Sequence, residues 1–167
     1  MSCLGVLFSL GQLEVDKLKS FTNDEERLEY LQEDLEETYF DEYPQYVTEL
    51  DKSWDALHRS LTDGHLTYSN GTFPLNHVIL GGEILYTSGD YIMTLKTPEQ
   101  VRTIADALES VNRDTLRQGY YQIDQNDYGF SLTDEDFEYT WDWLDQSKGF
   151  WKLAAENGRY VLFTVDQ

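Results

Sequence analysis

Residues 160–165 read Tyr-Val-Leu-Phe-Thr-Val, and this run is the strongest indication of the fold in the sequence. Its β-branched and aromatic side chains are typical of a strand. A shorter apolar run from Cys3 to Phe8, followed closely by Gly11, predicts a second buried strand near the other end of the chain. Two apolar strands near the two termini predict that they are neighbours in one small sheet.

The clearest helix start between these strands is Thr97-Pro98-Glu99-Gln100. Thr97 is suited to cap the helix, Pro98 to take its first position, and Gln100 to bond back onto the cap. An earlier helix start is predicted at Thr22-Asn23-Asp24-Glu25, where acidic side chains face the positive end of the helix dipole. Leu28, Leu31 and Leu35 follow it at helical spacing.

Two further helices are predicted from apolar side chains that recur every three or four residues. One covers Leu50 to Leu61, and the other runs from about Asp134 to Glu156. Additional strands are expected at Tyr86 and over residues 91–95. Because helices mix with few strands and show no regular βαβ alternation, the predicted fold class is α+β, with several helices packed on a small sheet that includes both terminal strands. Without a repeat or a linker, residues 1–167 are expected to form one domain.

The composition excludes several classes of partner. The chain has 32 Asp and Glu against 12 Lys and Arg, a formal net charge of −20, which repels both the nucleic-acid backbone and an anionic membrane. The single Cys3 excludes a disulfide framework and a cysteine-based zinc site. The apolar opening from Met1 to Leu10 lacks the basic segment of a signal peptide, and no stretch is long enough for a spanning helix. A cytoplasmic protein is therefore expected.

Four blocks in this order carry a resemblance to a known family: Leu50 to Gly64, Ile79 to Glu83, Leu95 to Val101, and Phe150 to Gly158. With these blocks the chain resembles the YfbM-like bacterial proteins, known as domain of unknown function 1877. The resemblance implies a bacterial cytoplasmic α+β domain. It carries over no catalytic residue, because the family has no agreed activity, and some of its members occur in toxin–immunity settings.

Asp51, Trp54 and His58 are the best candidates for a ligand pocket. In the predicted helix, Trp54 and His58 are four residues apart and share a face, with Asp51 one turn before Trp54. His58 would then serve as an acid/base group or a pH-sensitive contact, and Gly81-Gly82 would add backbone N–H groups that can face an anion. The alternative is structural: Trp54 and His58 pack in the core, and Gly81-Gly82 forms a tight turn.

Residues 124–135 resemble a calcium loop, with Asp124 and Glu135 at its first and twelfth positions. Tyr128 stands where an oxygen ligand is required, and Ser131 stands where an apolar residue normally anchors the loop, so we expect no calcium there. No pair of histidines has the i, i+4 spacing of a helical metal site, so neither a metal nor a cofactor is expected. The sequence also lacks a nucleophile motif, which favours a protein that is not an enzyme.

Carboxylates interleaved with aromatic side chains mark two candidate surfaces for a protein partner. Carboxylates increase the rate of association with a basic partner, and aromatic side chains supply contact area. The first surface comprises Glu33, Asp34, Glu36, Glu37, Tyr39, Asp41 and Glu42, and the second comprises Asp134, Glu135, Asp136, Glu138 and Asp142. The alternative is that this acidity only maintains solubility.

Three functions follow from these features. The first is a non-enzymatic module that binds a basic protein; its sharpest form is an immunity-type inhibitor that presents carboxylates to a nucleic-acid-acting toxin in place of phosphates. The second is a small-molecule-binding protein or enzyme with a pocket near Trp54 and His58. The third is an adaptor whose acidity serves only solubility. The charge, the interleaved aromatic side chains and the missing catalytic set favour the first.

Overall fold

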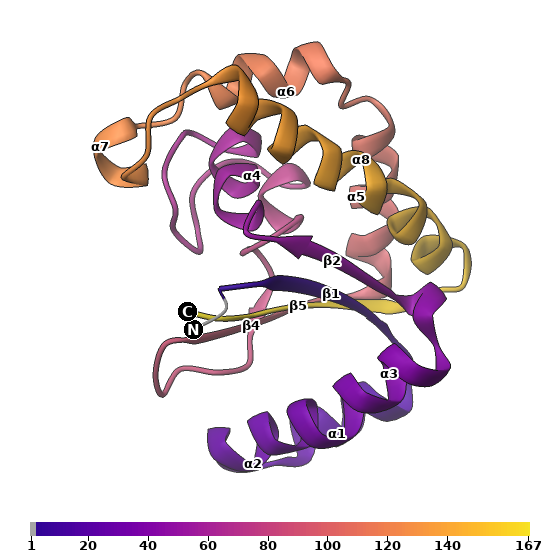
Figure 1. Ribbon diagram of the computed structural model, residues 1–167. Helices are drawn as coiled ribbons and strands as arrows, with labels where there is room; N and C mark the ends of the chain where they lie inside the picture. Colours follow the sequence, from indigo (N-terminus) through magenta and orange to yellow (C-terminus); the bar gives the residue numbers. More distant parts are fainter. Residues whose placement is uncertain (1–2) are drawn as a thin grey trace.

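The computed structural model describes residues 3–167 as a five-stranded sheet between two layers of helices (Figure 1). Met1 and Ser2, which open the apolar run 1–10, lie outside the described residues. The strands lie in the order β2-β1-β5-β4-β3, and every neighbouring pair is antiparallel. Their bounds are β1 (Gly5–Leu10), β2 (Val47–Asp51), β3 (Glu83–Ile84), β4 (Tyr91–Lys96) and β5 (Tyr160–Asp166).

The strand β5 lies in the middle of the sheet, between β1 and β4. Phe8 of β1 pairs with Leu162, so the strands near the two termini are neighbours, as predicted. Side chains along β5 alternate between the faces: Val161 and Phe163 pack in one core, and Leu162 packs in the other. Burial on both faces explains why this strand is apolar throughout.

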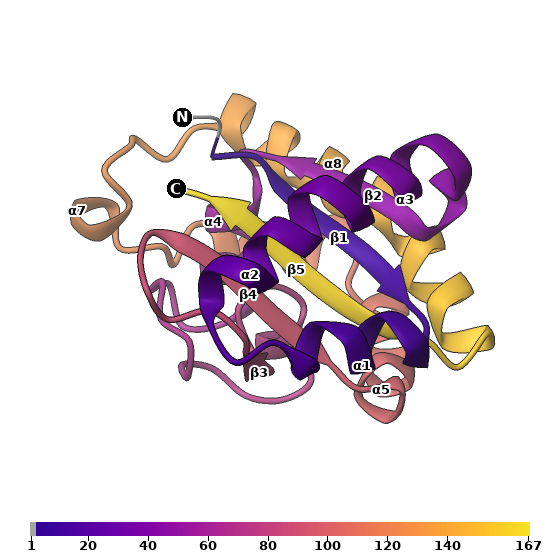
Figure 2. The same ribbon diagram turned by 90° about the horizontal axis from the view of Figure 1, so that it is seen from below.

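Helices from the first quarter of the chain cover one face of the sheet (Figure 2). They are α1 (Gln12–Ser20), α2 (Asp24–Glu29), a π-helix (Tyr30–Leu35) and α3 (Glu36–Glu42). The other face is covered by α4 (Trp54–Leu61), α5 (Pro98–Glu109), α6 (Arg113–Tyr120) and α8 (Asp134–Glu156), with the short α7 (Gln125–Tyr128) at the edge. Turns of 3₁₀ helix occur at Pro44–Tyr46 and Leu75–His77. This is the predicted α+β architecture. Within residues 3–167, no helix combines the length and the apolar composition needed to cross a membrane.

Two helix predictions are confirmed in detail. The backbone N–H of Gln100 donates to Thr97 Oγ1 at 3.2 Å, and the N–H of Thr97 donates to Gln100 Oε1 at 3.0 Å, which is the expected reciprocal cap. The helix α8 covers Asp134–Glu156, the range predicted from its apolar spacing.

The helix predicted over Leu50 to Leu61 is wrong at its start. The strand β2 continues through Asp51, and α4 begins at Trp54. Asp51 has a φ of 51°, a left-handed conformation that ends the strand and turns the chain toward the helix. Leu50 is buried in the sheet, and an apolar side chain at this position fits a helical or a strand pattern equally well.

Candidate functional site

Trp54 lines a cleft of about 540 Å³ between the start of α4 and the segment containing α7 and the first turns of α8. We call it the Trp54 cleft, and its volume lies within the range of small-ligand pockets. Its lining residues are Cys3, Lys52, Trp54, Asp55, Leu66, Tyr128, Phe130, Asp136, Tyr139 and Gln167.

A hydrogen-bonded turn at Asp51 fixes one wall of the cleft. The Tyr139 hydroxyl and the Lys52 backbone N–H both donate to Asp51 Oδ1, each at 2.7 Å. The Lys52 N–H also lies 3.0 Å from the Tyr139 hydroxyl oxygen, which accepts. These bonds join the end of β2 to α8. Asp51 therefore orients Tyr139 and does not itself line the cleft.

The indole of Trp54 is held firmly in this position. Its Nε1–H donates to the Cys3 carbonyl at 2.9 Å, and its ring packs against Phe163 with centroids 5.9 Å apart. A Cβ at Gly5 would stand 3.0 Å from atoms of both rings, so glycine leaves the room that the indole needs. Because Nε1 is already bonded, Trp54 offers the cleft apolar surface and not a free donor.

The remaining wall combines exposed aromatic side chains with carboxylates that are already engaged. Phe130 is 68% exposed. Asp136 accepts hydrogen bonds from the Tyr120 and Tyr128 hydroxyls at 2.7 and 2.8 Å. Burial, together with this carboxylate, raises the pKa of Tyr128, so its hydroxyl remains a donor. The exposed Lys52 ammonium has no hydrogen-bond or ion-pair partner among residues 3–167. The cleft therefore combines an apolar wall with one unpaired cation.

The structure does not bring His58 into this cleft. His58 is 0% exposed and is absent from the lining. Its Nε2 lies 2.8 Å from Asn70 Oδ1. Burial lowers the pKa of His58, which favours a neutral imidazole. This environment fits the core-packing alternative.

Gly81 and Gly82 also lie outside the cleft. A Cβ on Gly82 would stand 2.4 Å from the Leu95 carbonyl, and a Cβ on Gly81 would stand 2.4 Å from the Asn76 carbonyl. Gly82 has a φ of 122°, which other residues rarely adopt. The Gly81 N–H donates to the Asn76 carbonyl at 2.9 Å, so it is not available to an anion. Close backbone packing accounts for both glycines.

The first predicted acidic surface follows the π-helix and α3. We call its six carboxylates, Glu33, Asp34, Glu36, Glu37, Asp41 and Glu42, the acidic ridge. None of them forms an ion pair or a side-chain hydrogen bond with another residue of the range 3–167. No Lys or Arg stands in the sequence between Arg27 and Lys52. Tyr39 is buried and is not part of the exposed surface.

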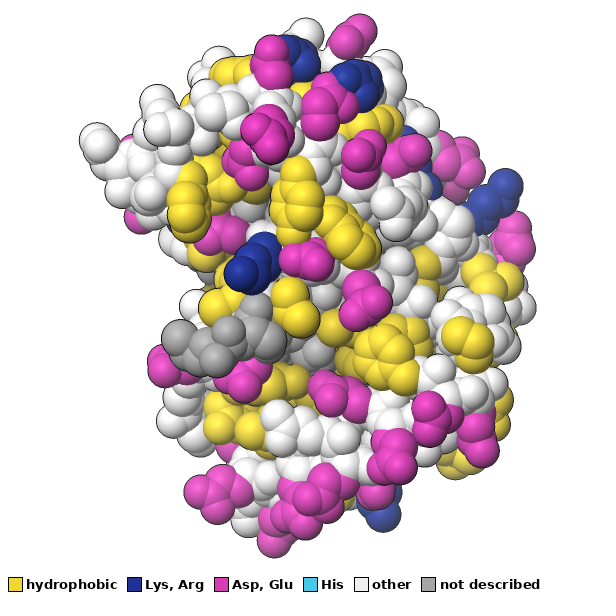
Figure 3. Space-filling view, in the orientation of Figure 1, with side chains coloured by type: hydrophobic (Ala, Val, Ile, Leu, Met, Phe, Trp, Pro, Cys, Tyr) yellow, Lys and Arg dark blue, Asp and Glu magenta, His cyan; other side chains and the backbone are white. Residues whose placement is uncertain are grey.

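The carboxylates of the second predicted surface are mostly engaged within the fold. Three of the five bind side chains from α6 or α7: Asp134 (Arg117 and Tyr121), Asp136 (Tyr120 and Tyr128) and Glu138 (Arg113). Glu135 and Asp142 have no such partner in the described part of the chain. Figure 3 shows acidic side chains over α8 and, separately, over the π-helix and α3 side, with hydrophobic side chains between them. The acidic ridge is the larger group of free carboxylates.

The segment 124–135 does not fold as a ligand cage. Asp124 Oδ1 accepts from the Asn126 N–H at 3.0 Å and caps α7, and Gly129 ends that helix with a φ of 83°. Within residues 3–167, no three His, Cys, Asp or Glu side chains gather as metal ligands would.

Lys52, Tyr128 and Phe130 line the cleft, but they were not among the residues predicted to form a ligand pocket. They come from the turn after β2 and from the segment around α7, which meet only in the folded chain. Phe130 is a large aromatic side chain in a polar stretch, and it was the one local signal that pointed to this region.

A family model described as "Domain of unknown function (DUF1877)" matches residues 1–164. The chain belongs to this family. Among solved structures, it is similar to the protein of unknown function YfbM from Escherichia coli, with a TM-score of 0.66 and 18% sequence identity over 97% of this chain and 99% of that chain. At this identity the similarity shows a shared fold. The match to the family model confirms the family resemblance. No curated protein matches the chain.

Proposed function

We propose that this DUF1877-family protein is a non-enzymatic module that binds a positively charged protein partner through the acidic ridge. The observation that supports it best is the row of six carboxylates without a cation among residues 3–167. Like charges at helical spacing destabilise a helix. A cluster of such charges with no Lys or Arg among them is understandable if a partner supplies the opposite charge.

Aromatic side chains on the ridge support the same proposal. Phe40 and Tyr43 are exposed, and they are interleaved with Glu37, Asp41 and Glu42. In protein interfaces, aromatic anchors provide much of the binding energy, while surrounding charges mainly increase the association rate and the specificity. The ridge contains both kinds of side chain.

In its sharpest form, the partner is a toxin that acts on nucleic acid. Such a protein carries a basic surface for phosphates. The carboxylates of the ridge would occupy that surface, and the net charge of −20 would accelerate the encounter. The chain would then be an immunity-type inhibitor.

Affinity capture from a lysate of the producing cells, with a salt gradient and mass spectrometry, tests the proposal. Wild type is compared with a ridge variant that carries Glu33→Gln, Glu37→Gln, Asp41→Asn and Glu42→Gln. The expected result is a basic protein that leaves wild type at moderate salt and is absent from the ridge variant. An acidic or neutral partner, or a partner retained equally by the variant, would show the proposal to be wrong.

A matched control changes the same number and types of carboxylate elsewhere. It carries Glu99→Gln, Asp106→Asn, Glu109→Gln and Glu156→Gln, all exposed positions on α5 and α8. We expect this control variant to retain the partner, because only the total charge changes. Equal loss in both variants would indicate non-specific charge attraction.

The Trp54 cleft favours a second candidate function, the binding of a small molecule. Its apolar wall and the unpaired Lys52 ammonium suit a ligand with an apolar body and an anionic group. A thermal-shift screen of aromatic carboxylates with wild type, Lys52→Gln and Phe130→Ala tests this function. Stabilisation that both variants preserve would exclude the cleft as the site. Tyr121→Ala, an exposed aromatic position outside the lining, is the control.

A further inference from the structure

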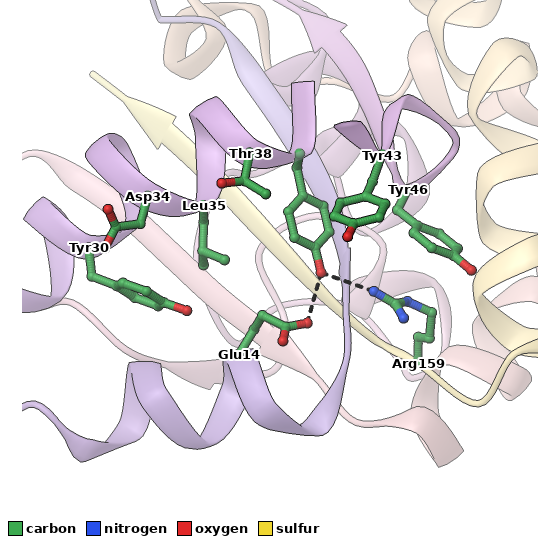
Figure 4. Close-up of a pocket in the computed structure, with 9 residues that line it drawn as sticks. Glu14, Tyr30, Asp34, Leu35, Thr38, Tyr43, Tyr46 and Arg159 are labelled. Atoms are coloured by element: carbon green, nitrogen blue, oxygen red, sulfur yellow. Dashed lines mark hydrogen bonds between the residues drawn. The ribbon is translucent and has the colours of Figure 1, made fainter. Parts of the chain in front are cut away.

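A second cavity, of about 440 Å³, lies between α1 and the helical segment formed by the π-helix and α3 (Figure 4). We call it the tyrosine pocket, because four tyrosines line it. Three charged side chains, Glu14, Asp34 and Arg159, line it with them. Asp34 also belongs to the acidic ridge, whereas Glu14 and Arg159 belong neither to the ridge nor to the Trp54 cleft.

Glu14 and Arg159 face the pocket on either side of one hydroxyl group. The Tyr39 hydroxyl donates to Glu14 Oε1 at 2.9 Å and accepts from Arg159 Nη2 at 3.0 Å. Figure 4 shows Glu14 and Arg159 extending toward each other from different elements, joined only through these two bonds. Opposite charges that both bind one hydroxyl group without a direct ion pair match a ligand that carries a carboxylate and an ammonium on the same carbon.

Arg159 is fixed in place but keeps part of its hydrogen-bonding capacity. Its Nε and Nη2 donate to the Ser9 carbonyl at 3.3 and 2.9 Å, and its guanidinium stacks 3.9 Å from the centroid of the Tyr46 ring. Among residues 3–167, Nη1 has no hydrogen-bond acceptor and the guanidinium has no carboxylate partner. In a chain with 32 Asp and Glu, a half-buried arginine without an acidic partner is positioned to receive a carboxylate from a ligand.

Glu14 has a corresponding free acceptor. Its Oε1 accepts from the Gly11 N–H at 3.1 Å as well as from Tyr39. Its Oε2 makes no hydrogen bond within the described residues. An ammonium group that enters the pocket can therefore bind this carboxylate without breaking the bond to Tyr39.

The π-helix forms the wall at the other end of the pocket. Tyr30 and Leu35 are its first and last residues, and Asp34 lies next to Leu35. Such segments insert an extra residue into a helical path and are frequent at functional sites. Burial raises the pKa of Tyr30, and the Glu14 and Asp34 carboxylates raise it further. The negative charges of these two carboxylates therefore act on this part of the pocket. Figure 4 shows Asp34 beside Tyr30, at the end away from Arg159.

We propose that the tyrosine pocket binds a free α-amino acid, with its carboxylate on Arg159, its ammonium on Glu14 and its side chain directed along Leu35 toward Asp34. Asp34 then favours a basic side chain over an acidic one. A cavity of this volume has room for any of the standard amino acids. The pocket shares Asp34 and Tyr43 with the ridge surface, but Glu14 and Arg159 lie outside it and the ridge variant leaves every lining residue unchanged, so the two proposals are tested separately.

Isothermal titration calorimetry with the twenty standard L-amino acids tests this assignment. The best binder is then compared with its amine analogue, which lacks the carboxylate, and its acid analogue, which lacks the ammonium. We expect each analogue to bind roughly tenfold or more weakly than the amino acid, and lysine or arginine to bind more tightly than glutamate. The assignment is wrong if no amino acid binds at roughly 10 mM, or if an analogue binds as well as the amino acid.

Two variants separate the site from general electrostatics. Glu14→Gln retains an acceptor for Tyr39 and should weaken the amino acid roughly tenfold while leaving the acid analogue unchanged. Glu29→Gln removes the same charge from the end of α2, next to the π-helix but outside both the pocket lining and the acidic ridge, and should change neither. Equal weakening by both variants would contradict the assignment. Circular dichroism verifies that each variant is folded.

Discussion

The amine side chain of Lys96 is buried entirely within the fold. It is 0% exposed, and its Nζ donates to the Ile79 carbonyl at 2.6 Å and to Thr94 Oγ1 at 2.7 Å. The bond to Ile79 ties the loop before β3 to β4, and the bond to Thr94 lies within β4. Burial lowers the pKa of Lys96 well below its ordinary value, because the charged form loses its hydration. Hydrogen bonds therefore hold the Lys96 side chain in place, while burial disfavours its charged form.

Replacing this side chain should change how stability depends on pH. Above the lowered pKa of Lys96 and below the ordinary lysine value, the unfolded chain binds more protons than the folded chain, so the free energy of unfolding rises with pH. This contribution is at most about 1.4 kcal/mol per pH unit. In urea denaturation over the pH range just below the ordinary lysine pKa of about 10.4, we expect the wild-type curve to rise relative to Lys96→Met. Parallel pH dependences would contradict the assigned pKa shift.

Asp51 is constrained by its backbone and by its side chain together. Its φ is 51°, and its Oδ1 accepts two hydrogen bonds, from Tyr139 and from the Lys52 N–H. We expect Asp51→Val to lower the free energy of unfolding by roughly 2 kcal/mol or more, because the β-branched side chain disfavours this φ and both bonds are lost. Asp51→Asn tolerates the conformation and keeps an acceptor, so its change should remain within about 0.5 kcal/mol. Urea denaturation of both variants measures the difference, and equal losses would argue against backbone strain at this turn.

The helices α4 and α6 approach so closely that they require a glycine. A Cβ on Gly119 would stand 2.0 Å from the Ser60 carbonyl, whereas a Cβ on Gly149 of α8 would meet nothing within 4 Å. Gly119→Ala should therefore lower the free energy of unfolding by roughly 1–3 kcal/mol or more, and Gly149→Ala should raise it by up to about 1 kcal/mol. Thermal unfolding of the two variants gives opposite shifts in Tm if the packing is as described. Shifts of the same sign would show that helix propensity, and not the contact with Ser60, determines the effect.

Local chemistry predicted those elements whose determinants lie close together in the sequence. The cap at Thr97 and the range of α8 are of this kind, whereas the pairing of β1 with β5 was inferred from the apolar composition of the two strands. The start of α4 was misassigned because the apolar Leu50 suits a strand or a helix. Gly119 is a poor helix former by itself, but α6 continues through Tyr120, because this glycine allows the close contact with α4. Likewise, Leu31 and Leu35 fit an α-helical spacing and conceal the π-helix.

The candidate sites were predictable to different extents for the same reason. The acidic ridge is contiguous in the sequence, so its composition was visible directly. Trp54 was singled out, but helical spacing grouped it with His58 on a face that turns out to be buried. The tyrosine pocket was not predicted, because Glu14 and Arg159 come from opposite ends of the chain and meet only in the folded protein.

The charge of the whole molecule should limit its stability at low ionic strength. The net charge is −20, and the ridge concentrates carboxylates without cations. Repulsion among exposed charges is screened by salt, so added NaCl should raise Tm. The ridge variant should have a higher Tm than wild type at low salt and a smaller response to salt. A lower Tm for the ridge variant at low salt would mean that these carboxylates stabilise the fold, contrary to the account given above.

The most direct test of the partner-binding proposal is the affinity of the captured partner for wild type, the ridge variant and the control variant over a range of salt concentrations. The proposal predicts that the ridge variant binds at least roughly tenfold more weakly, mainly through slower association, and with a reduced dependence of Kd on salt. The control variant should resemble wild type in both respects. A ridge variant with the affinity and salt dependence of wild type would contradict the proposal that the acidic ridge is the binding surface.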